Sequence, residues 1–447
     1  MTAGTIEIRN PADGSVVGSV PTAGEAGIDA ALALARRTPW ARTPAAERGA
    51  LLHTAAERLR AHADELAKTN EAETGKPCDE AREGVLAGAG TLDQYAELGP
   101  VHRGRSLLGD VGATDLMVPE PRGVVVALTP WNDPVAVACG LLGAALATGN
   151  TVVHKPSERA PHTGQLLGEV LGGVFPDGVL QTLHGDGGVG AILAMRSDVD
   201  VIAHVGSTAT GRSIAASAAA TGAKTLLENG GNDPLVIDED VDPVWAAGQA
   251  ALGAFANSGQ ICVAVERIYV CSAIAEPFLA ALVKEAETRT LAPLVDRRHR
   301  DHVHSHVEDA LGRGARLVAG GLVPDGPGAH YPATVLTGCA PDLRVMTEET
   351  FGPVAPVRVV ESFDEGLAEA AKGEYGLAAT VLTASMVHAQ RAWRELPAGT
   401  VKVNNVFGGA PGGAAHPRGR SGNGYGYGPE LLDEMTQTKL VHIAPPA

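Results

Sequence analysis

The chain has 447 residues, of which 45% are hydrophobic and 19% are charged. This composition predicts two or three folded domains and argues against a disordered chain. Lys and Arg total 35 against 52 Asp and Glu, so the net charge is -17. Such a charge repels nucleic-acid phosphates and anionic lipids, and we therefore expect neither a nucleic-acid nor a membrane partner.

The cysteines and the apolar segments indicate where the protein works. No basic-then-apolar leader precedes Asn10-Pro11, and the longest apolar stretch, residues 123–149, is interrupted by Pro130, Asp133 and Pro134. That stretch is typical of a strand, a turn and a buried helix rather than a membrane span. The five cysteines are an odd number without a C-x-x-C pair, which favours a reduced, cytoplasmic enzyme over a disulfide scaffold.

The first hundred residues predict packing helices. Leu52, Leu59 and Leu66 recur with small residues at three- and four-residue spacing, and residues 25–38 show a similar pattern. We assign no chemistry to this region.

From Gly123 onward, short apolar runs alternate with helical stretches. The expected strands are 123–128, 151–154, 179–183 and 201–205, and the helices between them lie near 135–148, 162–173, 188–196 and 210–220. This alternation predicts right-handed crossovers and a parallel sheet covered on both faces, with ligands at the carboxyl ends of its strands. The alternation restarts after residue 230, with strands at 235–237 and 267–270, which predicts a second α/β domain.

Two motifs resemble a dinucleotide site and a zinc site, but the residues around them do not support either ligand. Residues 185–190 match G-x-G-x-x-G between a strand and a helix, but no acidic residue ends a following strand. We interpret them as turn glycines, with a dinucleotide fingerprint or a loop near a cofactor as alternatives. His299, His302 and His306 share a helical face, as zinc ligands do, but charged residues surround them. We interpret this segment as a solvated charged face and expect no metal site.

Four other elements carry residue types suited to chemistry at a sheet edge. An amide follows the first strand, a cation and an acid end the second, a carboxylate stands beside two glycines, and a thiol follows a flexible loop. These elements are Thr129-Pro130-Trp131-Asn132, residues 151–158 ending in Lys155-Pro156-Ser157-Glu158, Leu227-Glu228-Asn229-Gly230-Gly231, and Asn257-Ser258-Gly259-Gln260-Ile261-Cys262.

Together these elements resemble the NAD(P)-dependent aldehyde dehydrogenase superfamily, and the resemblance covers nearly the whole chain. Further matches keep the same order and include the 34-residue spacing from Glu228 to Cys262. They are Glu73-Thr74-Gly75-Lys76-Pro77, Pro121-Arg122-Gly123-Val124, residues 147–153, residues 206–212 beginning Gly206-Ser207, residues 348–354 containing Glu349 and Phe351, Tyr375-Gly376-Leu377, and Ser421-Gly422-Asn423-Gly424.

The resemblance implies a fold and an assembly. It implies a Rossmann-like NAD(P)-binding domain (1–102 and 122–230), an α/β catalytic domain (231–431) and a small β oligomerisation arm (103–121 and 432–447). The implied partners are a small-molecule aldehyde and further copies of the chain, in a homodimer or homotetramer built through sheet extension.

The resemblance also implies a catalytic set that makes chemical sense. An aldehyde cannot release hydride until a nucleophile has made its carbon tetrahedral, and Cys262 fits that role. Only about 3% of a thiol with a pKa near 8.5 is ionised at pH 7, so we expect local activation. The Asn132 amide and the Cys262 backbone N–H would hold the oxyanion, and Glu228 would activate water to hydrolyse the thioester.

Cofactor residues follow from the same resemblance. Lys155 and Glu158 would hold the adenosine ribose, and Trp131, Gly206 and Ser207 would lie by the pyrophosphate. Glu349 would hold the nicotinamide ribose, with Phe351 against the ring. We expect NAD, because the Glu158 carboxylate would repel a 2′-phosphate, although NADP stays an alternative.

The substrate entrance departs from the family pattern. Asp133, Gly140 and Ala256 stand where aromatic residues are common in the family. Asp133 could favour a cationic aldehyde, whereas Arg418, Arg420 and His416 on the implied far wall would favour an anion. A pairing of Asp133 with one of those arginines is the interpretation that we favour.

Two other functions stay open. A CoA-acylating or semialdehyde-specific dehydrogenase is one, although CoA-acylating relatives often lack the glutamate that this chain has at position 228. A catalytically silent homologue with a binding role is the other, although Asn132, Glu228 and Cys262 are all present.

Overall fold

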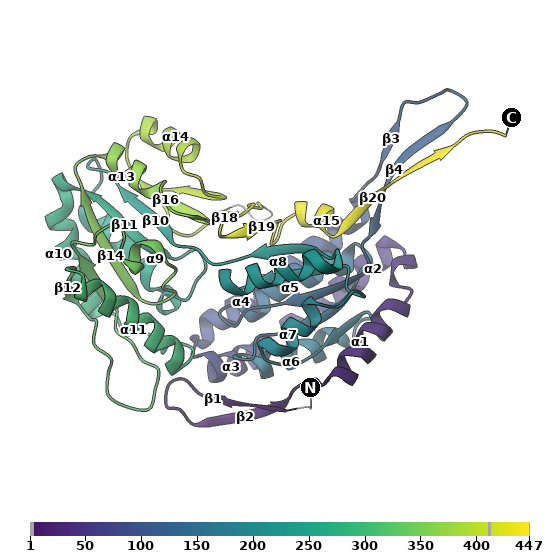
Figure 1. Ribbon diagram of the computed structural model, residues 1–447, viewed down its shortest axis with the longest axis horizontal. Coiled ribbons are helices and arrows are strands. Elements are labelled where there is room, and N and C mark those ends of the chain that lie inside the picture. The colour runs from purple at the N-terminus through teal and green to yellow at the C-terminus, as the bar shows by residue number, and fades with distance from the viewer. Residues whose placement is uncertain (1–3, 410–412, 447) are drawn as a thin grey trace.

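Two parallel sheets form the body of the protein in a computed structural model that describes residues 4–409 and 413–446 (Figure 1). The first sheet has six strands in the order β19-β9-β8-β5-β6-β7. All of its neighbouring strands are parallel except β19, which pairs antiparallel with β9. The strands are β5 (Val124–Leu128), β6 (Thr151–Lys155), β7 (Leu180–Thr182), β8 (Val201–Val205), β9 (Lys224–Glu228) and β19 (Gly422–Asn423). The predicted strand-helix alternation is confirmed.

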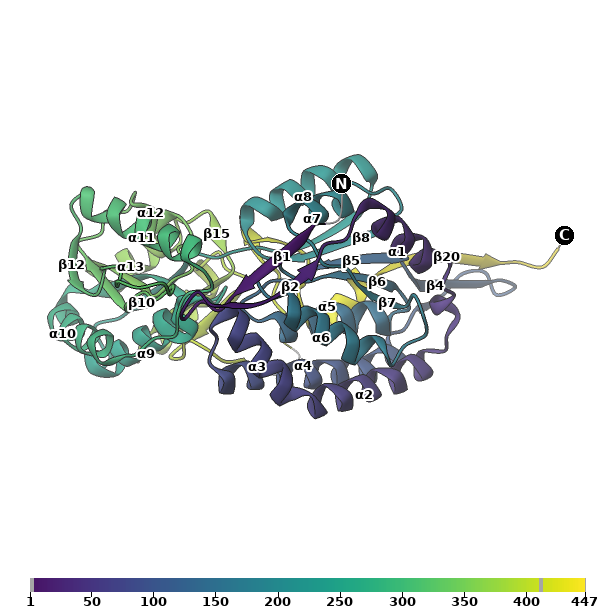
Figure 2. The ribbon, with the colours of Figure 1, turned by 90° about the horizontal axis from the view of Figure 1, so that it is seen from below.

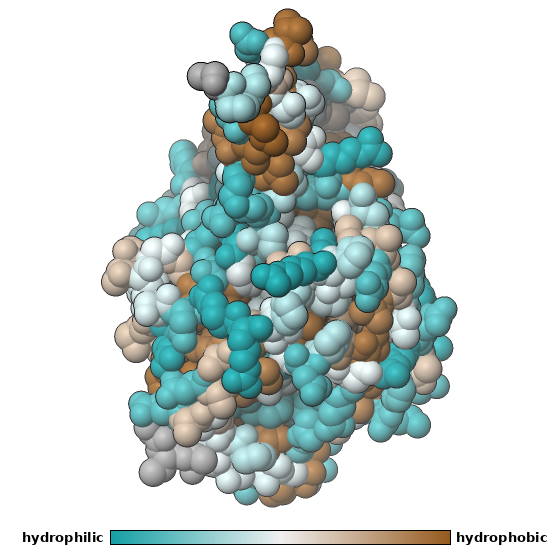
Figure 3. Space-filling model, turned by 90° about the vertical axis from the view of Figure 1, so that its right-hand side faces the viewer, coloured by the Kyte–Doolittle hydropathy of each residue, from teal (hydrophilic) through white to brown (hydrophobic). Residues whose placement is uncertain are grey.

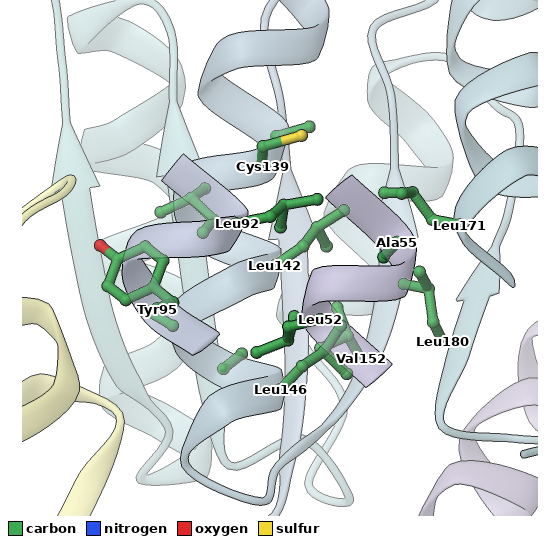
Figure 4. Close-up of a cluster of buried hydrophobic side chains, with 14 of the residues drawn as sticks. Leu52, Ala55, Leu92, Tyr95, Cys139, Leu142, Leu146, Val152, Leu171 and Leu180 are labelled. Carbon is green, nitrogen blue, oxygen red and sulfur yellow. The ribbon is translucent and has the colours of Figure 1, made fainter. Parts of the chain in front are cut away.

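Helices cover both faces of this sheet, as predicted. Alternate residues along a strand point to opposite faces, so Val125 and Ala127 join one buried cluster while Val124 and Val126 join another. Figure 4 shows the first cluster, in which Leu52 and Leu142 pack together. The covering helices are α1 (Glu25–Arg37), α2 (Ala45–Ala61), α4 (Cys78–Leu98), α5 (Pro134–Ala147), α6 (Pro161–Gly172), α7 (Gly187–Ala194) and α8 (Thr208–Thr221).

The second sheet has seven strands and confirms the second α/β unit. Its order is β12-β13-β14-β11-β10-β16-β17, with only the edge strand β12 antiparallel to its neighbour. The strands are β10 (Asp233–Ile237), β11 (Val265–Cys271), β12 (Arg316–Ala319), β13 (Thr334–Thr337), β14 (Val354–Val360), β16 (Ala378–Leu382) and β17 (Thr400–Val403). Around it lie α9 (Pro243–Phe255), α10 (Ser272–Thr288), α11 (Arg297–Gly312), α12 (Arg344–Thr347), α13 (Phe363–Ala370) and α14 (Met386–Glu395).

The N-terminal region differs from the all-helical expectation. Residues Thr5–Arg9 (β1) and Val16–Pro21 (β2) form an antiparallel hairpin that runs along one side of the molecule (Figure 2). Its turn reaches the other lobe, where the Ala329 N–H donates to the Pro11 carbonyl at 2.7 Å. The pattern of Leu52, Leu59 and Leu66 also spans two helices, because the chain turns at His62 between α2 and α3 (Ala63–Thr74).

A three-stranded antiparallel sheet projects from the body (Figures 1 and 3). It consists of β3 (Arg105–Leu107), β4 (Thr114–Pro121) and β20 (Thr436–Ile443), and α15 (Glu430–Glu434) leads into it. Leu108, Val111, Leu440 and other apolar side chains on it are exposed. Among the described residues, no helix is long and apolar enough to cross a membrane.

Candidate active site

Two adjoining cavities lie at the carboxyl ends of β5, β6, β8 and β9, where segments of the second lobe close over the first sheet. The larger has a volume of about 670 Å³, and the smaller has about 230 Å³. Trp131, Gly206 and Ser207 line both cavities. Lys155 and Glu158 line the larger cavity only, whereas Asn132, Glu228, Cys262, Glu349 and Phe351 line the smaller one only. The structure thus brings together every residue that the sequence predicted for catalysis or cofactor binding.

A strained turn presents Cys262 to the smaller cavity. Asn257 and Ser258 have φ values of 46° and 55°, a left-handed conformation that is uncommon for residues with a side chain. Gly259 follows at φ 75°, and an added Cβ there would lie 2.2 Å from the Gly352 carbonyl oxygen. Gln260 fixes the other end of this turn, since its Oε1 accepts from the Val295 N–H at 2.9 Å. Cys262, the predicted nucleophile, therefore stands on a loop with little freedom to move.

The surroundings of Cys262 do not favour its ionised form. Burial raises the pKa of the Cys262 thiol above its ordinary value, and the nearby carboxylates of Glu228, Asp233 and Glu349 raise it further. Without a bound cofactor, these groups favour the neutral thiol over the thiolate. A proton acceptor or a cation in the cavity is needed before the thiolate becomes abundant.

Glu228 ends β9 and points into the same cavity. Burial raises the pKa of its carboxyl group to about 7, which suits a group that must accept a proton near neutral pH. The C-terminal segment supports it: Gly422 pairs with Glu228 across β19 and β9. A Cβ at Gly426 would lie 1.9 Å from Glu228 Oε2, so glycine at that position leaves room for the carboxylate.

Asn132 is oriented by the loop that carries the thiol. Its Nδ2 donates to the Gln260 carbonyl at 3.1 Å, which uses one of the two amide hydrogens. Asn257 Nδ2 donates to the same carbonyl at 3.2 Å, so two amides hold it from different elements. The second hydrogen of Asn132 stays available to an oxygen atom in the cavity.

The paired glycines after Glu228 allow two other segments to approach closely. A Cβ at Gly230 would lie 2.0 Å from Glu349 Oε2, and one at Gly231 would lie 2.8 Å from the Cys262 carbonyl oxygen. Glu349 Oε1 accepts from the Gly231 N–H at 3.0 Å. Burial, together with the Glu266 carboxylate, raises the pKa of Glu349.

The larger cavity has the features of a dinucleotide site. The N-terminus of α8 opens onto it, and the Ser207 hydroxyl caps that helix by accepting from the Thr210 N–H. A helix N-terminus favours a phosphate group. Lys155 Nζ lies 3.8 Å from Glu158 Oε2 and donates to the Gly185 carbonyl at 2.7 Å, so a cation and an acid stand together as predicted for ribose hydroxyls. The residues present therefore fit a bound dinucleotide.

The G-x-G-x-x-G segment lies at the side of this cavity. Asp186 caps α7 through its side chain, and Gly187 and Gly190 line the cavity beside Lys155. The segment is thus a turn that starts a helix near the dinucleotide-like site. It agrees with the interpretation as turn glycines and also with the alternative of a loop near a cofactor.

The interpretation of His299, His302 and His306 as a solvated face was wrong. His299 and His306 are buried, and His299 and His302 line the smaller cavity. The histidines lie on the inner side of α11, because this helix packs against the 348–352 segment. There His306 Nδ1 lies 3.1 Å from Thr350 Oγ1. No metal-binding cluster of acidic, histidine or cysteine residues occurs in the described part of the chain.

Sequence reasoning missed three residues at the site. Arg159 lines both cavities, lies over Trp131 at 5.4 Å and pairs with Asp296 at 2.9 Å. Glu266 and His299 contact the backbone around Phe351. The one available signal for Glu266 was a charged pair, Glu266-Arg267, inside an otherwise apolar strand.

Comparison with known proteins gives the family. The model of the aldehyde dehydrogenase family matches residues 1–441. The chain belongs to the aldehyde dehydrogenase family.

The curated relatives and solved structures agree with this assignment. A 2-hydroxymuconic semialdehyde dehydrogenase from Pseudomonas sp. (strain CF600) is 36% identical over 90% of this chain and 88% of its own. A betaine aldehyde dehydrogenase from Cereibacter sphaeroides is 35% identical over 99% and 94%. The crystal structure of PnpE in complex with nicotinamide adenine dinucleotide has a TM-score of 0.96 and 33% identity, covering 99% of this chain and 95% of that one. The aldehyde dehydrogenase fold is confirmed.

The ion pairs of the residues predicted to line the substrate entrance of this aldehyde dehydrogenase differ from the favoured expectation. Asp133 pairs with Lys76 at 3.3 Å, not with an arginine, because it precedes α5 and faces the loop before α4. Arg420 pairs with Glu374 at 2.7 Å, and Arg418 lies in the short strand β18 (Arg418–Gly419), which pairs with β15 (Tyr375–Gly376). The structure therefore does not bring Asp133 together with these two residues.

Proposed function

We propose that this aldehyde dehydrogenase oxidises an aldehyde to a carboxylic acid with NAD as the acceptor, NADP being an alternative. The observation that carries the proposal is the convergence of Cys262, Glu228 and Asn132 on one cavity of about 230 Å³ that also contains Glu349 and Phe351. A thiol, a base and an amide donor are the groups that a covalent aldehyde oxidation requires.

The first step is addition of Cys262 Sγ to the aldehyde carbon. The Glu228 carboxylate, which lines the same cavity, accepts the thiol proton and passes it to solvent; the new C–S bond forms, and the carbonyl electrons move onto oxygen. The Asn132 Nδ2 hydrogen that is not used by Gln260 donates to this oxyanion, together with the Cys262 backbone N–H. Charge that develops in a largely dry cavity gains most from such fixed donors.

Hydride must then leave the tetrahedral carbon, and bound NAD supplies the acceptor. Lys155 and Glu158 would hold the adenosine ribose, and Trp131, Gly206 and Ser207 would hold the pyrophosphate at the start of α8. Glu349 and Phe351 would hold the nicotinamide end. The NAD complex of the related PnpE supports this assignment.

Glu228 acts on the thioester that remains on Cys262. Its carboxylate takes a proton from water, the hydroxide adds to the thioester carbon, and the C–S bond breaks to release the acid. A base with a pKa of about 7 is available in its carboxylate form near neutral pH and can accept the proton as water attacks.

The charge of the aldehyde is the open part of this proposal. The relatives include a semialdehyde dehydrogenase and betaine aldehyde dehydrogenases, whose names imply substrates of opposite charge. Lys76 already compensates Asp133, and Glu374 compensates Arg420. We therefore infer that neither residue selects a charged substrate strongly.

We further propose a division of labour along the chain. Residues 1–102 and 122–230 bind the dinucleotide, 231–431 carry the nucleophile, and 103–121 with 432–447 form an arm for a homodimer or homotetramer. The exposed apolar side chains of the arm support the last point. The five cysteines, all free, support a reducing, cytoplasmic location.

The decisive experiment is NADH or NADPH formation across a panel of aldehydes, with Cys262→Ala as the blank. The panel pairs neutral, amino- and carboxy-aldehydes of equal length, each with and without CoA. We expect thiol-dependent NADH and a free acid as product. An acyl-CoA product would instead identify a CoA-acylating enzyme, and no signal despite NAD binding would favour a silent homologue.

A further inference from the structure

Phe351 has an unusual backbone conformation at the edge of the smaller cavity. Its φ is 53°, in the left-handed region that costs free energy for a residue with a Cβ. Its ring lies edge-on to Trp131, with centroids 5.5 Å apart and an interplanar angle of 81°. A conformation of this kind persists only where its surroundings hold it.

The side chain of Glu266, on β11, holds the amino side of Phe351. Glu266 Oε1 accepts from the Phe351 N–H at 2.7 Å, and Oε2 accepts from the Thr350 N–H at 2.9 Å. Asn232 Nδ2 donates to Oε2 at 3.2 Å and so fixes the carboxylate from its other side. The neighbouring Arg267 directs its guanidinium to the backbone carbonyls of Asn232 and Ala370.

The imidazole of His299, on α11, holds the carbonyl side. Its Nε2 lies 2.7 Å from the Phe351 carbonyl oxygen, and since a carbonyl only accepts, Nε2 is the donor. Burial lowers the pKa of His299 to about 4, so the ring is neutral near pH 7 and its other nitrogen carries no proton. Both hydrogen-bonding groups of the Phe351 backbone are thus taken by buried side chains from two different elements.

This arrangement also reaches the nucleophile. The carbonyl of Gly352, the next residue, packs against Gly259 in the Cys262 turn so closely that an added Cβ would lie 2.2 Å from it. Movement of the 350–352 segment would therefore disturb both the wall of the cavity and the loop of the thiol.

We propose that Glu266 is a positioning residue that, with His299, locks Phe351 in the left-handed conformation in which its ring forms the wall for the nicotinamide. This inference rests on the proposed function, because it assigns Phe351 to the nicotinamide end. A carboxylate is well suited to this role because each of its two oxygens accepts from one of two adjacent N–H groups, whereas a neutral amide has a single accepting oxygen and carries an NH2 group in place of the other.

The test compares Glu266→Gln with the wild-type enzyme. The single-turnover rate of NADH formation at saturating NAD should fall about tenfold, and the KM for NAD should rise while the KM for the aldehyde stays unchanged. A deuterium at the aldehyde carbon should slow this single turnover, which shows that hydride transfer is the step observed.

A matched control is Asp238→Asn in the same lobe. Asp238 is a buried carboxylate that accepts from Thr383 Oγ1 at 2.7 Å and lies 2.6 Å from His388 Nδ1, with neither partner in the 350–352 segment. It should change heat stability without changing the single-turnover rate or the KM for NAD. An equal loss in both variants would show that Glu266 is merely structural and would overturn the proposal.

A second variant covers the case in which Glu266→Gln does not fold. Asn232→Ser removes the Asn232 amide from the Glu266 carboxylate and from the Glu348 carbonyl but makes no direct change to residues 350–352, and it should shift the same two parameters in the same direction by about threefold. A wild-type single-turnover rate and a wild-type KM for NAD in a folded Glu266→Gln or Asn232→Ser enzyme would refute the positioning role of Glu266. Failure of the wild-type enzyme itself to form Cys262-dependent NADH would refute the proposed function instead.

Discussion

The turn that carries Cys262 and the predicted substrate entrance at Asp133 are held in place in different ways. Around Cys262, side chains from other segments hold backbone groups in place: two amides bind the Gln260 carbonyl, Glu266 binds the Phe351 N–H, and His299 binds the Phe351 carbonyl. At the predicted entrance, charged side chains form ion pairs, as Asp133, whose side chain is 36% exposed, does with Lys76, whose side chain is 11% exposed. The region around Cys262 tolerates little change, because each substitution there leaves a hydrogen-bonding group without its partner. An ion pair that is open to solvent contributes little to stability.

The largest expected effect comes from the thiol itself. Cys262→Ala should reduce turnover by more than about a thousandfold, because no other described side chain in the small cavity is a comparable nucleophile. NAD binding, measured by calorimetry, should stay within about threefold of wild type. Turnover near the wild-type rate would remove Cys262 from the mechanism.

Glu228→Gln should separate the two halves of the reaction. A burst of one NADH per active site is expected, followed by a steady state about 10²- to 10⁴-fold slower, because the thioester is no longer hydrolysed efficiently. Rapid-quench mass spectrometry should find the acyl group on Cys262. An unchanged steady state would mean that another group activates the water.

The same carboxyl group predicts a pH dependence of both activity and stability. Burial raises its pKa to about 7, so the basic form, and with it hydrolysis, should be lost as the pH falls through 7. For stability the sign is opposite: folding favours the protonated form, so this contribution is present below the unfolded pKa of 4.5 and lost as the pH rises through 7. Glu228→Gln should therefore melt at a higher temperature than wild type at pH 8, and the difference should shrink toward pH 5.

Asn132→Ala should lower the rate of NADH formation by about 100- to 1,000-fold, the usual cost of losing one oxyanion donor. Asn257→Gly is the matched control, since it removes the other amide from the Gln260 carbonyl and still accepts a positive φ. The control should lose far less activity in the same single-turnover assay. Comparable losses would mean that Asn132 acts by holding the loop rather than by binding the oxyanion.

Alkylation of the cofactor-free enzyme should test whether the surroundings of Cys262 keep its thiol protonated. Because burial and three carboxylates raise the pKa of Cys262, its reaction with iodoacetamide should be slow at pH 7 and accelerate steadily into the alkaline range. Peptide mapping by mass spectrometry follows the site. Rapid labelling at neutral pH would show that the thiolate already exists without the cofactor.

The smallest effect is expected at the entrance. Asp133→Asn should change kcat/KM by less than about threefold for neutral, amino- and carboxy-aldehydes alike, because Lys76 already offsets the carboxylate. A selective loss of more than tenfold with the amino-aldehyde would instead make Asp133 a recognition site for a cation.

The amino-acid sequence by itself determined the parallel sheets and the three residues that we propose as the catalytic set. Strand-helix alternation indicates the covered sheet directly, since residues of a strand that is buried on both faces are mostly apolar, as in β5. Asn132, Glu228 and Cys262 lie in short motifs whose order along the chain is kept by the family, so their convergence on one cavity could be expected.

Only the tertiary structure decided which partners these residues meet. The histidines of α11 look solvated in a segment rich in charge, yet packing against the 348–352 segment buries two of them. Glu266 contacts residues 84 and 85 positions away, and Asp133 pairs across 57 positions with Lys76 rather than with an arginine. Hydrogen bonds and ion pairs depend on distances of a few ångströms between elements that are remote in the chain, and periodicity records which face is buried but not what lies against it.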